Sequence, residues 1–527
     1  MSGPNFDPVQ LARVVERQRE GADALSNAWV SASAGAGKTR VLRDRVLRLL
    51  MAGVRPERIL CLTFTKAAAA EMSRRINDEL GAWTVADDPV LNGFLEDLYG
   101  TVPPPEMLVR ARRLFARVLD APGGMKIMTI HSFCQSVLRR FPLEAGVVPH
   151  FQVMEDRDAG EMLEEAKADL LLAASDTTRP LHGAVAEIAA RVHEIRFPEL
   201  LGEVARARSQ FADLLNETGG VEGASARLAD FLGIAPDTSE AELLAQACAD
   251  DAFAVSDLRR VVLALAEGTK GDQERAALIA SWLAGDTETR VGMILDYSSV
   301  FLTKKGEIRK TLATKGVIKA EPDVAEILGR EAERMLELRE QTLKANLLTA
   351  NTALLQVAAA LTTLYEARKA ARGRLDYDDL ISRTRNLLRG DGAAAWVLFK
   401  LDGGIDHVLI DEAQDTNPEQ WEVVGALVEE FFAGISARDE AVEGLGLPER
   451  SVFAVGDVKQ SIYSFQGAEP RRFREMRDYL SARAKAADGR WVNVALDFSF
   501  RSSRPVLEAV DKVFSAPGAR GGVVEDG

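Results

Sequence analysis

The stretch Ala32-Ser33-Ala34-Gly35-Ala36-Gly37-Lys38-Thr39 decides how the rest of the chain is organised. The apolar residues 28–30 precede it and are typical of a strand, and residues 40–50 follow with apolar side chains at helical spacing. A strand, a glycine-rich loop and a helix in this order form the context of a phosphate-binding loop. Gly35 and Gly37 allow the backbone to come close to phosphate oxygens.

The last residues of this loop add a charge and a metal ligand. Backbone N–H groups and the helix N-terminus face a bound anion. Lys38 can then reach the outer phosphates, and Thr39 can hold a magnesium ion. The strict motif has Gly at its first position, where this chain has Ala32. The sequence therefore predicts a nucleoside triphosphate site, with an ordinary strand–turn–helix as the structural alternative.

Length and composition indicate a globular protein of several domains. The 527 residues exceed what one hydrophobic core organises, so we expect two to four domains. Apolar residues make up 47% and charged residues 28%, which is ordinary for such proteins. The net charge of −15 excludes a basic surface over the whole chain, and argues against a small nucleic-acid-coating protein. A locally basic groove stays compatible with it.

Cysteine usage and the apolar pattern bear on the compartment. Cys61, Cys134 and Cys248 are far apart and share no metal-ligand spacing, which favours a reduced, cytoplasmic environment. The first residues show no basic region followed by an apolar run, so we expect no signal peptide. We also expect no apolar run that approaches the length of a membrane span.

The alternation of elements divides the chain into segments. Residues 1–150 and 371–490 alternate short apolar strands with helices, and predict two parts of one α/β domain with a parallel sheet. Residues 151–370 carry long segments of helical period with few strand signals. We therefore expect a large, mainly α-helical domain inserted into the α/β domain.

Polar and aromatic side chains follow the predicted ends of two further strands. Residues 58–64 end in Phe64, which Thr65 follows, and residues 126–130 lead directly to His131. Open α/β sheets bind ligands at the carboxyl ends of their strands. We expect Phe64 and Thr65 to lie near a ligand, while a ligand contact and a structural role both stay open for His131.

Two adjacent carboxylates, Asp411 and Glu412, follow a predicted strand at residues 405–410. Carboxylates at the tip of a buried strand are costly unless they serve a purpose. With a phosphate loop in the same sheet, Asp411 can hold the magnesium ion, directly or through water. Glu412 can orient and deprotonate the attacking water. An acidic helix cap is the structural alternative.

The loop after the predicted strand at residues 451–457 carries a glutamine and two aromatic residues. Gln460 can sense the terminal phosphate of a nucleotide. Tyr463 and Phe465, two positions apart, can offer ring faces on which bases stack, although either ring can also turn inward.

The helical region, which is otherwise rich in acidic residues, contains one basic run. Residues 303–319 contain six basic side chains and one acidic side chain, and Lys304 and Lys305 lie at the start. Such a run is either a solvated surface or a contact to the phosphate backbone of a nucleic acid, and the sequence leaves both open.

Taken together, these segments resemble superfamily 1 DNA helicases of the UvrD/Rep type. Within that family the chain is most similar to helicase-nuclease subunits of the AddA type, on softer features that include the large helical insert. The matching motifs, in chain order, are Gln18, residues 32–39, 63–68, 129–133, 409–415, 455–463 and 500–502. The match covers nearly the whole chain, but Gln466 stands where the family usually has Arg.

The resemblance implies a RecA-like fold and roles for single residues. Gln18 would read adenine, Arg40 would lie near the nucleotide, and Arg501 would contact the terminal phosphate across a cleft. Gln460 would couple that phosphate to DNA. The residues implied along the single-strand path are Thr65, His131, Tyr463 and Phe465.

The resemblance also implies a function for the complete protein. It would be an ATP- and Mg²⁺-dependent helicase that moves three-prime to five-prime, processes DNA ends in double-strand break repair and recombination, and works with an AddB-type partner. Residues 491–527 would open a second RecA-like domain, most of which is absent here together with an exonuclease domain. We therefore expect a truncated chain.

Two other classes of function fit part of the sequence. The first is a nucleotide-switched DNA-binding module without unwinding activity, which the base-stacking aromatic residues and His131 argue against. The second is a phosphate-loop kinase for a small molecule, for which the sequence offers no acceptor site.

Overall fold

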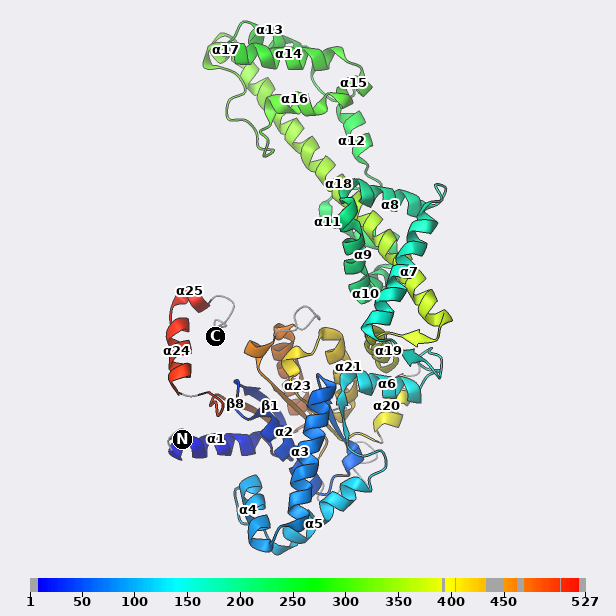
Figure 1. Cartoon of the computed structure of the whole chain (residues 1–527). Coiled ribbons are helices and arrows are strands. Elements are labelled where there is room, and N and C mark those ends of the chain that lie inside the picture. The colour runs from blue at the N-terminus through cyan, green and yellow to red at the C-terminus, as the bar shows by residue number, and fades with distance from the viewer. Residues whose placement is uncertain are drawn as a thin grey trace. The chain divides into compact units, whose positions relative to one another are not determined.

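The computed structural model describes residues 8–390, 394–402, 404–432, 449–461, 469–502 and 504–520. They divide into two compact units. The first, which we call the sheet unit, comprises Met1–Met154 and Gly373–Gly527, and the second, the helical unit, comprises Glu155–Arg372. The chain thus leaves the sheet unit once and returns to it (Figure 1).

The sheet unit is built on a six-stranded sheet in which every neighbouring pair of strands is parallel. The strand order β3-β2-β6-β7-β1-β8 places the strand before the glycine-rich loop beside two later strands. The strands are β1 (Asn27–Ala32), β2 (Ile59–Thr63), β3 (Lys126–Thr129), β6 (His407–Ile410), β7 (Ser451–Gly456) and β8 (Trp491–Leu496). Because the strands are parallel, the loops that follow them gather at one edge of the sheet.

Helices cover both faces of this sheet, as the near-continuous apolar strands require. On one face pack α2 (Lys38–Met51), α3 (Lys66–Val85), α4 (Asp88–Tyr99) and α5 (Pro105–Leu119). On the other pack α6 (Ile130–Arg140), α19 (Tyr377–Arg389), α20 (Ala394–Asp402), α21 (Pro418–Glu429) and α23 (Pro470–Ala486). Trp29 of β1 is buried among the rings of Trp421, Phe473 and Trp491 on this second face.

Three further α-helices and a second small sheet belong to the described part of the sheet unit. They are α1 (Pro8–Gly21), α24 (Arg504–Phe514) and α25 (Pro517–Arg520), and the two-stranded sheet of β4 (Gln152–Val153) with β5 (Arg374–Leu375). β4 and β5 pair where the chain leaves the unit and where it returns, so they close the insertion at its base.

The strand at 491–496 corrects one expectation. The resemblance implies that residues from 491 onward open a second domain, but β8 pairs in parallel with β1 over six residue pairs, from Asn27 and Trp491 to Ala32 and Leu496. It is the edge strand of the first sheet, and buried Val494 and Leu496 belong to its core. The pairing of β8 with β1 is a long-range contact that local sequence pattern does not report.

Residues 81–124 contain the helices α4 and α5. α4 begins at Asp88 with a proline in its first turn and ends before Gly100, which has a positive φ of 78°. Its buried side chains Leu91, Leu95 and Leu98 lie at helical spacing. These are ordinary start, period and stop signals, so α4 was predictable, and it matters because it carries Asp97 to the site described below.

The helical unit surrounds one long helix, α18 (Asp323–Ala371), of 49 residues. The other helices are α7 (Asp156–Ala174), α8 (Pro180–Arg191), α9 (Phe197–Arg206), α10 (Arg208–Thr218), α11 (Val221–Leu232), α12 (Glu240–Ala247), α13 (Val255–Ala266), α14 (Lys270–Ala284), α15 (Thr287–Gly292), α16 (Ile294–Phe301) and α17 (Lys315–Ala320). Figure 1 shows α13, α16 and α17 against the first half of α18 and α7 to α11 against the second half.

α18 also corrects the expectation about apolar runs. It contains an 18-residue window with a mean hydropathy of 1.5 and at most two charged residues, so by length and composition alone it is long enough to cross a membrane. It is the one such helix among the described residues. A third of that window is buried inside the protein. Leu348, Leu355 and Leu361 of the same helix are covered by the neighbouring helices.

Candidate nucleotide-binding site

The glycine-rich loop joins β1 to the N-terminus of α2 at the carboxyl edge of the sheet. Gly35 and Gly37 have φ angles of 75° and 89°, a left-handed conformation that favours glycine. The amide of Ala36 donates to the Ser33 carbonyl at 3.1 Å, which folds the loop back on itself. The loop therefore turns tightly and brings backbone N–H groups toward one place, as a phosphate site requires.

Lys38 meets Glu412 directly across the sheet edge. Its Nζ atom lies 2.6 Å from Oε2 of Glu412, and the lysine side chain is only 10% exposed. The two residues come from α2 and from the loop after β6, so the order of strands in the sheet brings them together. Lys38, which is predicted to contact phosphates, is therefore in direct contact with Glu412, which is predicted to act as the general base.

Asp411 directly precedes Glu412 in the chain and follows the last residue of β6. Burial raises its pKa to about 6, and the adjacent Glu412 carboxylate adds to the rise, while Lys38 and the backbone amide of Glu412 oppose it. That amide donates to Oδ1 of Asp411 at 3.1 Å. A partly buried carboxylate whose ionised form is disfavoured gains from a cation beside it.

Gln414 connects the carboxylates of Glu412 and Asp415 to the segment that follows β7. Its side-chain amide contacts Glu412, Asp415 and the backbone of Asp457 at the end of β7. Asp457 in turn accepts a hydrogen bond from the side chain of Gln460 at 2.5 Å. The structure therefore links predicted site residues of two strands through a glutamine that lies within the sequence motifs but has no predicted role.

Gln18 of α1 reaches the loop from the side. Its Nε2 atom donates to the Ala36 carbonyl at 3.0 Å, and its side chain is buried. The Oε1 atom is buried and accepts no hydrogen bond from the described residues. A Cβ atom on Gly37 would come within 2.7 Å of Nε2, so the glycine admits this amide. Gln18 thus holds an unused acceptor next to the loop.

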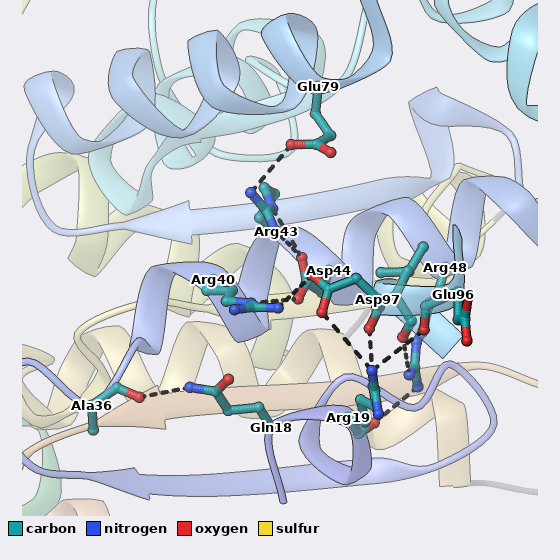
Figure 2. Close-up of polar contacts among 11 residues, drawn as sticks. Gln18, Arg19, Ala36, Arg40, Arg43, Asp44, Arg48, Glu79, Glu96 and Asp97 are labelled. Atoms are coloured by element: carbon teal, nitrogen blue, oxygen red, sulfur yellow. Dashed lines mark hydrogen bonds and ion pairs between the residues drawn. The ribbon is translucent and has the colours of Figure 1, made fainter. Parts of the chain in front are cut away.

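A set of charged residues surrounds the start of α2 on the α4 side (Figure 2). Arg40 contacts Asp97 at 2.6 Å and Asp44 at 3.5 Å. Arg19 of α1 reaches the same residue, donating to the Asp97 carbonyl at 2.9 Å. Asp97 of α4 therefore orients Arg40. The sequence analysis missed Asp97, although the helical pattern of residues 88–99 could have indicated the helix that carries it.

The segment after β8 packs on the glycine-rich loop from the other side. The amide of Phe500 donates to the Gly35 carbonyl at 2.9 Å, and the amide of Ser33 donates to the Leu496 carbonyl at 2.9 Å. A Cβ atom on Gly35 would lie 2.6 Å from Cβ of Arg501. Arg501 is therefore beside the loop in the sheet unit itself, with its side chain exposed.

Two of the residues predicted along the single-strand path, Thr65 and His131, follow two adjacent strands. Thr63 of β2 pairs with Thr129 of β3. Thr65 and His131 each come two residues after a member of this pair, so they follow the two strands at equivalent positions. Thr65 caps α3 by accepting from the amide of Ala68 at 3.0 Å. Phe64 is partly exposed at the same edge.

His131 packs edge-on against the ring of Tyr377, with ring centres 5.4 Å apart. Burial lowers its pKa, while Asp378 works in the opposite direction. His131 therefore favours the neutral form, which offers a ring face or a single hydrogen bond rather than a positive charge.

Lys304 and Lys305 lie in the helical unit, on a short hairpin formed by residues 302–309. Leu302 and Ile308 form an antiparallel bridge, and both lysines at the turn are exposed. Gly306 follows with a φ of 84°, and a Cβ atom there would overlap the guanidinium of Arg339 of α18. The start of the basic run, with Lys304 and Lys305, is thus a folded turn next to Arg339 of α18. Tyr463, Phe465 and Gln466 lie outside the described residues.

A parallel sheet whose glycine-rich loop opens a helix, with a lysine and two carboxylates meeting beside it, defines the class of phosphate-loop α/β proteins. Comparison with known families narrows this class. Residues 15–480 match the model of the UvrD/REP helicase N-terminal domain, so the chain belongs to the UvrD/REP helicase family.

Curated relatives agree with this assignment. The AddA subunit of the ATP-dependent helicase/nuclease of Lactiplantibacillus plantarum is 25% identical over 89% of this chain and 36% of its own length. The protein of the same name from Enterococcus faecalis is 27% identical over 94% of this chain and 37% of its own length. The protein of the same name from Desulforudis audaxviator is 28% identical over 98% of this chain and 40% of its own length. This chain therefore spans less than half the length of the relatives it matches.

Proposed function

We propose that this chain is the ATP-binding N-terminal part of an ATP-dependent DNA helicase, in which the sheet unit is a RecA-like motor domain. The observation that carries the proposal is the meeting of Lys38 with Glu412 beside a loop with two left-handed glycines. The family relationship supports the same conclusion.

Each residue around the loop has a chemical task in this proposal. Lys38 neutralises charge on the outer phosphates of ATP. Glu412 accepts a proton from the water that attacks the terminal phosphate, and Gln460 senses that phosphate. Arg501 approaches the same phosphate from the segment after β8. Lys38 begins α2 after the glycine-rich loop, and the other three residues follow β6, β7 and β8 of the same sheet.

Gln18 would recognise the base, and Arg40 would lie near the nucleotide. Adenine presents a donor and an acceptor on one edge, and Gln18 offers the unused acceptor Oε1 beside the loop. Arg40 is held by Asp97 and Asp44, so its guanidinium is oriented before a nucleotide binds. The loop backbone from Ala32 to Thr39 completes the phosphate contacts.

The residues present also fit a magnesium ion. Mg²⁺ in phosphate sites takes one or two protein oxygens together with phosphates and waters. Thr39 and Asp411 supply a hydroxyl and a partly buried carboxylate whose raised pKa would fall beside a cation. The ion would supply charge neutralisation at the phosphates.

Single-stranded DNA would run across the ends of β2 and β3. Phe64, Thr65 and the neutral ring of His131 lie at that edge, and Tyr463 with Phe465 would add stacking faces. The exposed lysines at 304 and 305 would contact phosphates of DNA from the helical unit.

The relatives' name, a subunit of an ATP-dependent helicase/nuclease, supports a nuclease activity and a partner subunit for the complete protein. From the resemblance to the AddA type we further propose an exonuclease that processes DNA ends in double-strand break repair and recombination, in the cytoplasm, with three-prime to five-prime movement and an AddB-type partner. The present chain would contribute the nucleotide site and the helical insert.

ATP hydrolysis by the full-length protein tests the proposal. We expect single-stranded DNA to stimulate hydrolysis, Lys38→Ala to abolish it, and the exposed Lys270→Ala of α14 to leave it unchanged. A rate indifferent to DNA would overturn the helicase assignment. Stimulated hydrolysis without displacement of a labelled strand would instead indicate a nucleotide-switched binding module.

A further inference from the structure

We propose that Gln414 is a positioning residue that orients the carboxylate of Glu412 and ties it to the Asp457–Gln460 loop. The inference rests on the proposed function, because it assigns Gln414 a part in ATP hydrolysis. Gln414 itself touches no reacting atom and acts only through its neighbours.

The hydrogen bonds of Gln414 fix which way its amide points. The backbone N–H of Asp457 can only donate, and it lies 2.8 Å from Oε1 of Gln414, so the oxygen must face β7. Nε2 then faces the acids, donating to Oε2 of Glu412 at 2.8 Å and to Oδ2 of Asp415 at 3.0 Å. The side chain is 1% exposed, so water does not compete for these bonds.

This arrangement divides the two oxygens of Glu412 between two tasks. Oε2 receives both Lys38 and Gln414, whereas Oε1 accepts no hydrogen bond from the described residues. When ATP phosphates take over Lys38, Gln414 remains as the donor that holds Oε2. The other oxygen, Oε1, is thereby kept in a constant direction to receive the proton of the attacking water.

Gly456, the last residue of β7, provides the space for this amide. A Cβ atom at this position would lie 2.5 Å from Oε1 of Gln414 and 2.9 Å from the ring of Phe473. Any other residue would push the amide away from the Asp457 backbone. The absence of a side chain at Gly456 therefore allows Gln414 to keep its hydrogen bond to Asp457.

The contacts continue from Asp457 to the predicted phosphate sensor. The carboxylate of Asp457 accepts from the Lys459 amide at 3.1 Å and from Nε2 of Gln460 at 2.5 Å. Glu412, Gln414, Asp457 and Gln460 thus form one unbroken series of hydrogen bonds across the ends of β6 and β7. A shift of the loop that carries Gln460 will reach the general base through this series.

Steady-state ATP hydrolysis by the full-length protein tests the role, with Gln414→Glu as the central variant. Glutamate keeps the volume and the acceptor toward Asp457 but removes the donor to Glu412. We expect kcat to fall about 10- to 100-fold, with KM for ATP and affinity for a non-hydrolysable ATP analogue within about twofold of the parent. Gln414→Ala should give the same division between kcat and KM.

Gln420→Glu is the matched control. Gln420 is a buried glutamine of α21 whose oxygen also accepts a backbone amide, from Asn417 at 3.2 Å, and it makes no hydrogen bond to Glu412 in the described part of the chain. We expect its kcat to stay at the parent value. A parent-like kcat in Gln414→Glu, or a loss of analogue affinity equal to the loss of kcat, overturns the positioning role.

Lys38→Ala separates this inference from the function on which it rests. If Lys38→Ala still hydrolyses ATP at the parental rate, the proposed function fails. If Lys38→Ala is inactive while Gln414→Glu is fully active, only the role of Gln414 fails.

Discussion

Lys38 and Glu412 lie 374 residues apart in the sequence, yet Nζ of the lysine is 2.6 Å from Oε2 of the glutamate. A phosphate-loop lysine cannot hold this carboxylate and the outer phosphates with the same geometry. Nucleotide binding would therefore exchange one anionic partner of Lys38 for another. After this exchange Oε2 of Glu412 would keep only the hydrogen bond from Gln414.

We expect Glu412→Gln to separate binding from hydrolysis. The amide no longer competes as an anion for Lys38, so ATP affinity should rise several-fold, while kcat should fall about 10³-fold because the general base is lost. Fluorescent-nucleotide titration and steady-state ATPase assays on the full-length protein measure the two effects. Glu475→Gln, an exposed change on α23, serves as the control. Weaker nucleotide binding together with unchanged kcat would contradict the assignment.

Asp97 should influence nucleotide affinity although it lies outside every motif. Asp97→Asn removes the charge that holds Arg40 at 2.6 Å, and exposed pairs of this kind contribute about 0.2 to 1 kcal/mol. We expect KM for ATP to rise about two- to fivefold with kcat unchanged. Glu96→Gln is the natural control, because Arg19 contacts only the backbone carbonyl of Glu96, at 3.3 Å. An equal effect of both changes would argue for general loss of charge.

The hairpin of residues 302–309, together with Lys310 directly after it, should contribute to DNA binding in a salt-dependent way. Replacing Lys304, Lys305 and Lys310 with alanine removes up to three phosphate contacts, so the plot of log affinity against log salt should become less steep by about 1 to 3. Fluorescence anisotropy with a labelled DNA measures this slope. Arg259→Ala with Lys270→Ala removes exposed charges elsewhere in the helical unit as a control. An unchanged slope would return the hairpin to a solvated surface.

His407 should make the fold sensitive to acid. Burial, with help from Arg45 and Arg450, lowers its pKa to about 3, so it stays neutral in the folded chain. The unfolded chain takes up a proton near pH 6.5, so this stability is present above that pH and is lost as the pH falls toward 3.

From pH 7.5 to 5.5 this histidine alone should lower the free energy of unfolding by about 1.4 kcal/mol. Denaturant titrations of the chain at the two pH values measure the change. His407→Gln should lose less stability over the same interval, and His150→Gln, at an exposed position, should follow the parent. A parent-like pH dependence in His407→Gln would show that other groups control acid unfolding.

The elements around the glycine-rich loop were predictable because local signals agree there. An apolar strand, two glycines and an amphipathic helix occur within 25 residues, and β1 and α2 form at the predicted positions. β2, β3, β6 and β7 follow the same rule, since each is a short apolar run ending in polar residues. The parallel sheet then places those ends together without further information.

What could not be predicted depends on partners distant in the chain. β8 pairs with β1 across more than 450 residues, and its sequence does not state which sheet it joins. Gln414 lies within a recognised motif, but only the folded chain shows its oxygen against the Asp457 backbone. The apolar stretch of α18 was missed for another reason, since asparagine, threonine and glutamine interrupt it without adding charge.

The backbone at Glu412 has a consequence of its own. Its φ of 49° is left-handed, a conformation shared by only one other non-glycine residue, Asp488, among the described residues. Such a conformation costs a side-chain-bearing residue about 1 kcal/mol. Glu412→Gly should therefore leave a more stable chain than Glu412→Ala, although both lose the same carboxylate. At this position the proposed chemistry would place a carboxylate where folding alone would favour glycine.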